Sequence, residues 1–194
     1  MGSAACAKLT GHAGIDTKGR VAMGLRDRIE DRRGGGATRY RMQQKLLAIG
    51  DDSWVEDEAG NKVYKVNGKA LRIRDTWVLE DAAGNEVAEI KERKLSVRDA
   101  MKIHFPGGEA TVKKALVGVR QRFHVEVEGG EDLKAHGNIL DHEYEIERDG
   151  DTIATVSKRW FRVRDTYGVE IQPGFHPALV LAVTVAIDGM SRDD

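Results

Sequence analysis

The sequence contains little cysteine, almost no net charge and no long apolar run. Cys6 is the only cysteine in 194 residues, which excludes an internal disulfide framework and is compatible with a reducing compartment. The 31 Lys and Arg residues nearly balance the 32 Asp and Glu residues, so no overall charge draws the chain to nucleic acid or to an acidic membrane. We therefore expect no nucleic-acid partner, and any anionic partner would need a local basic patch.

Sequence motifs of common enzymes are also missing. The chain has no Gly-x-Ser-x-Gly, no His-Glu-x-x-His and no cysteine pair for zinc. Gly68-Lys69-Ala70 lacks the upstream glycine and the hydroxyl of a phosphate-binding loop. These absences predict no catalytic residues and no cofactor, and hence a protein that is not an enzyme.

Histidines and glutamates are the candidate metal ligands and acid–base groups of the sequence. Four histidines could meet in space: His104, His124, His136 and His142. However, His104 and His124 lie on the polar phase of their strands, which favours solvated surface positions over metal binding. Glu143, Glu145 and Glu147 share one strand face, and the alternation points all three outward as a solvated acidic face. The sequence therefore predicts no metal site.

The N-terminal part of the chain differs from the rest. Residues 1–39 have no sustained apolar period and include Arg32-Arg33-Gly34-Gly35-Gly36, a composition typical of a flexible charged linker. No apolar segment of a secretory signal lies near Cys6. We expect a flexible N-terminal extension over residues 1–39, a folded domain over residues 40–190, and a cytoplasmic location.

From residue 40 to residue 174, apolar and polar side chains alternate with a period of two. Met101, Ile103 and Phe105, for example, alternate with Lys102 and His104. Glycine-containing turns recur about every twenty residues, the signature of one repeated supersecondary unit. Alternation of this kind indicates an antiparallel sheet with one buried face. The segments number about twelve, too many for a comfortable open sheet, so the sequence predicts an all-β closed antiparallel barrel.

Residues 177–187 form an uncharged run that ends at Asp188-Gly189. About eleven residues are too few to span a bilayer, which needs roughly twenty. Local signals are divided, because the β-branched content favours a strand while Pro177 and Gly189 favour the two ends of a helix. A barrel of about twelve strands is too wide for its own side chains to fill. We therefore expect a central apolar C-terminal helix that fills the barrel and ends at Asp188-Gly189.

Several segments of the chain match the pattern of one known family: Tyr40-Arg41-Met42, Lys45-Leu46, Ile49-Gly50-Asp51-Asp52, Gly68-Lys69-Ala70-Leu71, Arg74-Asp75-Thr76, Lys158-Arg159-Trp160-Phe161, Arg164-Asp165-Thr166-Tyr167-Gly168-Val169 and the run 177–188. Through these segments the chain resembles the LURP-one-related family, within the Tubby C-terminal-like superfamily and related to phospholipid scramblase-like proteins. The resemblance covers residues 40–190 and implies a barrel around a central helix. Members of the superfamily bind phosphoinositides, are assigned lipid scrambling, or have no established biochemistry. The chain matches neither the calcium loop nor the palmitoylated cysteine cluster of the scramblases.

Arginines recur at the ends of successive hairpins and are expected to gather at one rim of the barrel. They are Arg72, Arg74, Arg98, Arg120, Arg122, Arg162 and Arg164. Such a ring could grip phosphates or carboxylates. Asp75, Asp99, Asp141 and Asp165 recur at the same places, however, where an aspartate caps a tight turn and partly neutralises its neighbour. Turn chemistry and rim ion pairs are thus the favoured interpretation.

Two basic segments are predicted to escape this neutralisation. Lys113-Lys114 is followed by no acidic residue before Glu126, and Lys158–Arg162 combines cations with aromatic rings. Basic residues beside an exposed aromatic suit an anionic headgroup region. The candidate ligand-binding residues are Lys113, Lys114, Lys158, Arg159, Trp160 and Arg162. The sequence thus favours a binding module for anionic lipid headgroups or phosphorylated ligands, peripheral to a membrane. A protein-interaction or structural scaffold remains the alternative.

Overall fold

A computed structural model describes residues 36–43, 53–68, 76–93, 100–115, 121–161 and 165–191. These residues form twelve strands, one short 3₁₀ helix and one α-helix. The elements are β1 (Thr38–Gln43), β2 (Ser53–Glu56), β3 (Lys62–Gly68), β4 (Thr76–Asp81), β5 (Glu86–Glu92), β6 (Ala100–Phe105), β7 (Gly108–Ala115), β8 (Arg122–Val127), β9 (Leu133–Asn138), β10 (Glu143–Arg148), β11 (Asp151–Ser157), η1 (Lys158–Trp160), β12 (Thr166–Ile171) and α2 (Pro177–Ser191).

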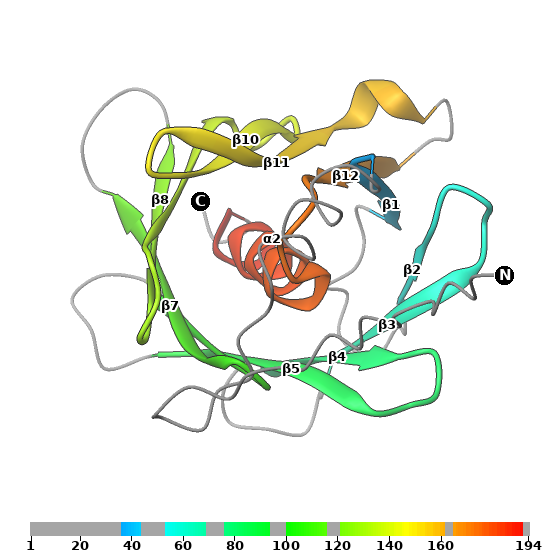
Figure 1. Ribbon diagram of the computed structural model, residues 1–194, viewed down its shortest axis with the longest axis horizontal. Coiled ribbons are helices and arrows are strands. Elements are labelled where there is room, and N and C mark those ends of the chain that lie inside the picture. Colours follow the sequence, from blue (N-terminus) through cyan, green and yellow to red (C-terminus); the bar gives the residue numbers. More distant parts are fainter. Residues whose placement is uncertain are drawn as a thin grey trace, which may run out of the picture. The chain divides into compact units, whose positions relative to one another are not determined.

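The strands make a closed antiparallel barrel around α2, which confirms the predicted fold (Figure 1). Each strand pairs with its neighbours in the sequence, and β1 pairs with β12 to close the ring. Thr38 and Arg39 pair with Ile171 and Glu170, so the barrel begins before residue 40, inside the segment predicted to be flexible. The rest of that prediction, residues 1–35, lies outside the described residues.

The apolar side chains of the period-two alternation point into the barrel and fill its interior. On β6, Met101 and Ile103 are buried while Lys102 and His104 are only partly covered, as the sequence predicts. Closing the ring gives each of the twelve described strands a partner on both sides, so none of these strands is an open edge.

Two of the hairpin turns have the same structure, which explains part of the sequence repeat. The Asp57 carboxylate accepts hydrogen bonds from the backbone N–H (2.8 Å) and side-chain amide (2.9 Å) of Asn61. Asp81 accepts the same two bonds from Asn85, at 2.8 and 2.9 Å. The side-chain amide contributes most to lowering the pKa of each aspartate, followed by the backbone amides. Each turn is preceded by a register shift, between Val55 and Glu56 or between Leu79 and Glu80.

The helix α2 lies inside the ring of strands and is buried on all sides from Val180 to Met190 (Figure 1). A helix that is apolar all round is stable only where every face is covered. It packs against β5 and β6 most extensively, and also against β7 and β12. Among the described residues, no helix combines the length and apolar content needed to cross a membrane.

The predicted helix end at Asp188-Gly189 is wrong, because α2 continues to Ser191. Asp188 is buried and accepts a hydrogen bond from the Tyr167 hydroxyl. Gly189 lies against the barrel wall, where an added Cβ would come within 2.8 Å of the Met101 Cε atom. Both residues therefore serve contacts inside the barrel, whereas the rule that glycine ends a helix describes termini in solvent.

Other polar groups gather around Asp188. The His142 Nε2 atom lies 3.4 Å from an Asp188 carboxylate oxygen, and the His142 ring packs on Tyr167 with 4.3 Å between centroids. Tyr144 is also buried here. Burial raises the pKa of the Tyr144 hydroxyl well above its ordinary value, and the Asp188 charge adds to this, while contact with Thr184 opposes it. The barrel interior thus contains a compact polar cluster among apolar side chains.

Candidate site for an anionic ligand

The chain leaves β11 through η1, which folds two aromatic side chains onto the outside of the barrel. Tyr167 and Val169 of β12 point inward, so Gly168 between them faces out. A Cβ built on Gly168 would lie 2.6 Å from Cε3 of Trp160 and 2.8 Å from Cε2 of Phe161. Both distances are too short for real contacts. The absence of a side chain at Gly168 therefore makes room for the two rings.

Two arginines of β1 cover these rings. Arg39 and Arg41 point outward from β1, and Arg41 pairs with Gly168 in the register of β1 and β12. The Arg39 Cζ atom lies 5.0 Å from the centroid of Trp160, and the Arg41 Cζ atom lies 5.9 Å from that of Phe161. Both distances are within the range of cation–π attraction. Barrel closure therefore joins cations from one end of the domain to rings from the other.

Acidic residues hold the arginines and the turn in place. Arg39 pairs with Glu170 (Nε–Oε2 2.6 Å), and Arg41 pairs with Glu56. Glu143 of β10 accepts hydrogen bonds from the Ser157 hydroxyl at 3.0 Å and from the Lys158 backbone N–H at 3.1 Å. These bonds anchor η1 to the neighbouring strand. Glu143 is therefore more than part of a solvated acidic face.

Arg159 is the most exposed cation of this region. Its backbone N–H donates to the Ser157 hydroxyl at 3.1 Å, which fixes the backbone of the turn. Its side chain is 84% exposed, and Nε lies 3.6 Å from a Glu143 carboxylate oxygen, at the outer range of an ion pair. A loosely paired, exposed guanidinium on a fixed backbone can bind an external anion at little conformational cost.

We call Arg39, Arg41, Lys158, Arg159, Trp160 and Phe161 the basic-aromatic cluster. It contains three of the predicted residues, Lys158, Arg159 and Trp160, on a 3₁₀ turn. Arg162, the fourth predicted residue of this segment, lies outside the described residues. The sequence reasoning missed Arg39 and Arg41. The signal that could have found them is the outward phase of Arg39-x-Arg41 in the first strand, combined with closure of β1 onto β12.

The structure does not bring Lys113 and Lys114 to the basic-aromatic cluster. Both belong to β7, which is separated from β11 by β8, β9 and β10. The prediction that this pair escapes neutralisation is wrong for Lys113, whose Nζ atom lies 2.5 Å from Oε1 of Glu126 on the adjacent strand. Glu126 is distant along the chain but close across the sheet. Lys114 is partly buried on the same strand.

The predicted ring of arginines falls mostly on residues that are not described. Arg72, Arg74, Arg98, Arg120, Arg162 and Arg164 lie outside the described residues, as do Asp75 and Asp99. Arg122 is exposed at the start of β8. Turn chemistry appears at Asp141, which accepts a 2.6 Å hydrogen bond from the Asn138 side-chain amide, and at Asp165, whose φ is 60°.

The four histidines do not converge, and each pairs with an acid of its own. His104 pairs with Glu109 at 2.8 Å, His124 with Asp132 at 3.2 Å and His136 with Glu147 at 2.9 Å. His104 and His124 are partly exposed, as their polar phase predicts. Lys102 contributes most to lowering the pKa of Glu109, and His104 adds to this. His142 differs from the other three because it packs inward against Asp188.

Comparison with known proteins agrees with this architecture. The family model described as LURP-one-related matches residues 38–188. A crystal structure of a protein from Arabidopsis thaliana superposes with a TM-score of 0.60 at 17% sequence identity, covering 80% of this chain and 92% of that one. At that identity the likeness concerns the fold alone, a closed barrel around a central helix. A search of curated proteins gave no match. Because the family model spans the barrel from its first strand into its central helix, this chain belongs to the LURP-one-related family.

Proposed function

We propose that the protein is a non-enzymatic binding module that engages anionic lipid headgroups through the basic-aromatic cluster. The observation that carries this proposal is the exposed guanidinium of Arg159 on a fixed turn, beside the Trp160 ring covered by Arg39. An aromatic ring flanked by cations suits the interface between headgroups and acyl chains. The proposal places the protein on the cytoplasmic face of a membrane, as a peripheral protein.

The expected attachment is weak and sensitive to salt. Each basic side chain near an anionic membrane contributes about 1 kcal/mol. The cluster holds four cations, but Glu170, Glu56 and Glu143 partly neutralise three of them. Screening at physiological ionic strength acts over about 8 Å and weakens exposed charges most. Binding is therefore expected to respond strongly to the anionic lipid fraction of the membrane.

Co-sedimentation with vesicles tests the proposal. The full-length protein is mixed with neutral phosphatidylcholine vesicles or with vesicles that also contain phosphatidylserine or a phosphoinositide, at low and at physiological salt. We expect sedimentation with the anionic vesicles and its loss as salt rises. Lys158→Glu/Arg159→Glu should abolish it. Lys91→Glu/Lys113→Glu makes the same change of charge on β5 and β7 and should retain most of it.

Two further results would reject lipid headgroups as the ligand. Equal sedimentation with neutral and anionic vesicles would contradict the proposal, as would equal losses in the two double variants. Competition by a soluble inositol phosphate measures how much of the binding is to phosphate alone. Circular dichroism of each variant confirms that the barrel is folded.

A further inference from the structure

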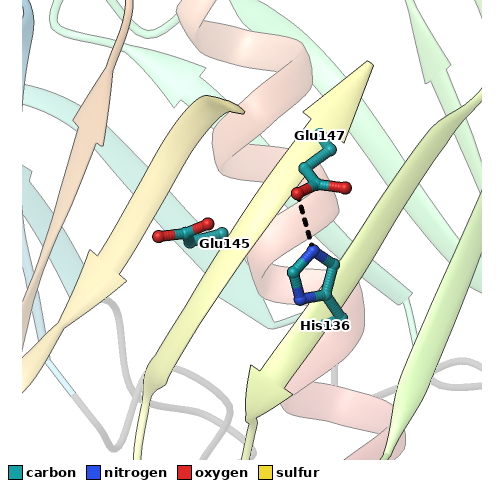
Figure 2. A group of neighbouring side chains, drawn as sticks. All are labelled: His136, Glu145 and Glu147. Carbon is teal, nitrogen blue, oxygen red and sulfur yellow. Dashed lines mark ion pairs between the residues drawn. The ribbon is translucent and has the colours of Figure 1, made fainter. Parts of the chain in front are cut away.

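A second group of side chains lies on another part of the barrel wall, on β9 and β10. His136 pairs with Glu145 in the strand register, and Glu147 follows two residues later on the same face of β10. Figure 2 shows the three side chains on adjacent strands, with an ion pair between His136 and Glu147. The His136 Nε2 atom lies 2.9 Å from Oε1 of Glu147. One ligand atom from each residue lies within 4.8 Å of the other two.

This group differs from the outward pair of His104 and Glu109. His104 lies next to Glu109, which also binds Lys102 at 2.5 Å, so that pair already contains a compensating cation. Beside His136, the third group within ligand distance is a second carboxylate, and the cations Arg122 and Lys134 stand opposite His136 and Glu147 in the strand register. The Glu145 and Glu147 carboxylates lie two residues apart on one face of β10, and like charges this close repel each other. A divalent cation between the two carboxylates would relieve this repulsion.

We propose that His136, Glu145 and Glu147 form a binding site for a divalent transition metal ion, with Zn²⁺ the best match. Imidazole nitrogen and carboxylate oxygen are both zinc ligands, and imidazole favours transition metal ions over calcium and magnesium. Calcium and magnesium prefer all-oxygen sites, so they fit less well. Ligand atoms on one tetrahedral zinc lie about 3.3 Å apart, given bond lengths of about 2.0 Å. The ligand atoms here lie within 4.8 Å of one another, and His136 Nε2 is 2.9 Å from Oε1 of Glu147, so the three groups must adjust their separations to hold one ion. Rotation of the partly exposed glutamate side chains can supply this movement.

Neighbouring residues provide access to the site. His136 and Glu147 also line a surface pocket of about 390 Å³, together with His124, Arg122 and Lys134. An ion held between His136 and Glu147 would therefore border open space. Three protein ligands leave one tetrahedral position for water, and the pocket gives that water room to enter. The Thr152 hydroxyl lies 3.3 Å from Oε2 of Glu145 and helps to orient that carboxylate.

Calorimetric titration of the full-length protein with zinc chloride tests the site. The protein is first freed of metal with a chelator and kept in a buffer that does not bind zinc. We expect one saturable site for the wild type. Removing a residue that only hydrogen-bonds to a metal ligand lowers metal affinity by about 10- to 100-fold. Removing a ligand itself should therefore weaken zinc binding by about 100-fold. This is expected for His136→Ala, Glu145→Gln and Glu147→Gln.

His104→Ala is the matched control, because it also removes an outward histidine paired with a glutamate. It should leave zinc affinity unchanged. Substitution of Co²⁺ gives an independent readout, since the visible absorption of bound cobalt should disappear in Glu147→Gln. Glu145→Gln is nearly isosteric, so it tests the site even where His136→Ala folds poorly. The proposal is overturned by the absence of a saturable isotherm in the wild type, or by equal affinities in wild type and Glu147→Gln.

Discussion

The Tyr167 hydroxyl donates a 2.6 Å hydrogen bond to the carboxylate of Asp188. Tyr167 belongs to β12 and Asp188 to α2, so this bond ties the barrel wall to the central helix. Both residues are buried. Hydrogen bonds to charged groups contribute about 1.5–3 kcal/mol to stability, and a buried charge that loses its donor is costly. The bond therefore determines how firmly the helix is held at this point.

Substitution of the two interior tyrosines should have unequal effects. Tyr167→Phe removes the donor to Asp188 and should lower the free energy of unfolding by about 2–3 kcal/mol. Tyr144→Phe removes a buried hydroxyl that has no hydrogen bond of good geometry among the described residues. It should change stability by less than about 0.5 kcal/mol. Urea denaturation of both variants at neutral pH measures the difference, and equal losses would contradict this account.

The repeated turns predict how stability responds to acid. Since the pKa values of Asp57 and Asp81 are lowered in the folded state, these carboxylates stabilise the fold fully above about pH 5, where the unfolded chain is also ionised. The contribution is lost as the pH falls through the lowered values. Asn61→Ala/Asn85→Ala removes the main cause of both shifts. The double variant should be less stable than wild type at pH 7, and the gap should shrink between pH 5 and pH 2.5.

Urea denaturation across that pH range provides the test of the turns. A gap that stays constant with pH would show that the asparagines act through the turn backbone and not through the carboxylates. Glu109, whose pKa is lowered mainly by Lys102, titrates in both proteins and therefore cancels in the comparison.

Gly168 should be intolerant of a side chain because of the rings packed on it. Gly168→Ala places a Cβ 2.6 Å from Trp160, so the two rings must move away from β12. Overpacking of this kind costs about 1–3 kcal/mol. Tryptophan emission should shift to the red as Trp160 becomes exposed. Gly36→Ala is the control, since nothing lies within 4 Å of a Cβ there, and it should alter neither stability nor emission.

The central helix should contribute much of the stability through its buried leucine. Leu181 is fully buried, and Leu181→Ala should cost about 2–5 kcal/mol by leaving a cavity. Leu140 is 60% exposed, so the same substitution there should cost less than about 0.5 kcal/mol. Denaturation midpoints and slopes measured side by side provide the comparison. Similar losses at the two positions would mean that α2 does not fill the barrel as the structure has it.

The sequence predicts the fold well because strand pairing here is local. Met101 and Ile103 point inward because apolar side chains alternate, and this signal needs no knowledge of distant residues. Consecutive strands are neighbours throughout, so counting segments also gives their order in the barrel. The helix follows from the interior that these strands leave to be filled. The last turn of the helix cannot be predicted in this way, because Asp188 and Gly189 contact Tyr167 and Met101, which lie elsewhere in the chain.

The candidate site depends on contacts that local patterns do not contain. Arg39 and its partner Glu170 are 131 residues apart, and they meet only because β1 pairs with β12. Glu126 reaches Lys113 across the sheet for the same kind of reason. Cations and rings that are close in the sequence, such as Lys158, Arg159 and Trp160, could be found from the sequence. The residues that cover or neutralise these side chains, such as Arg39 and Glu143, could not be found from the sequence.

Pairing of β1 with β12 also has a consequence for how the chain is made. The ring of strands cannot close until Ile171 has been synthesised, and the helix that fills it comes later still. Until then the apolar faces of the earlier strands have nothing to cover them, a state that favours aggregation. We expect the barrel to fold only once α2 has left the ribosome, and not piece by piece as the earlier strands appear. A nascent chain truncated before Pro177 should therefore remain bound to chaperones.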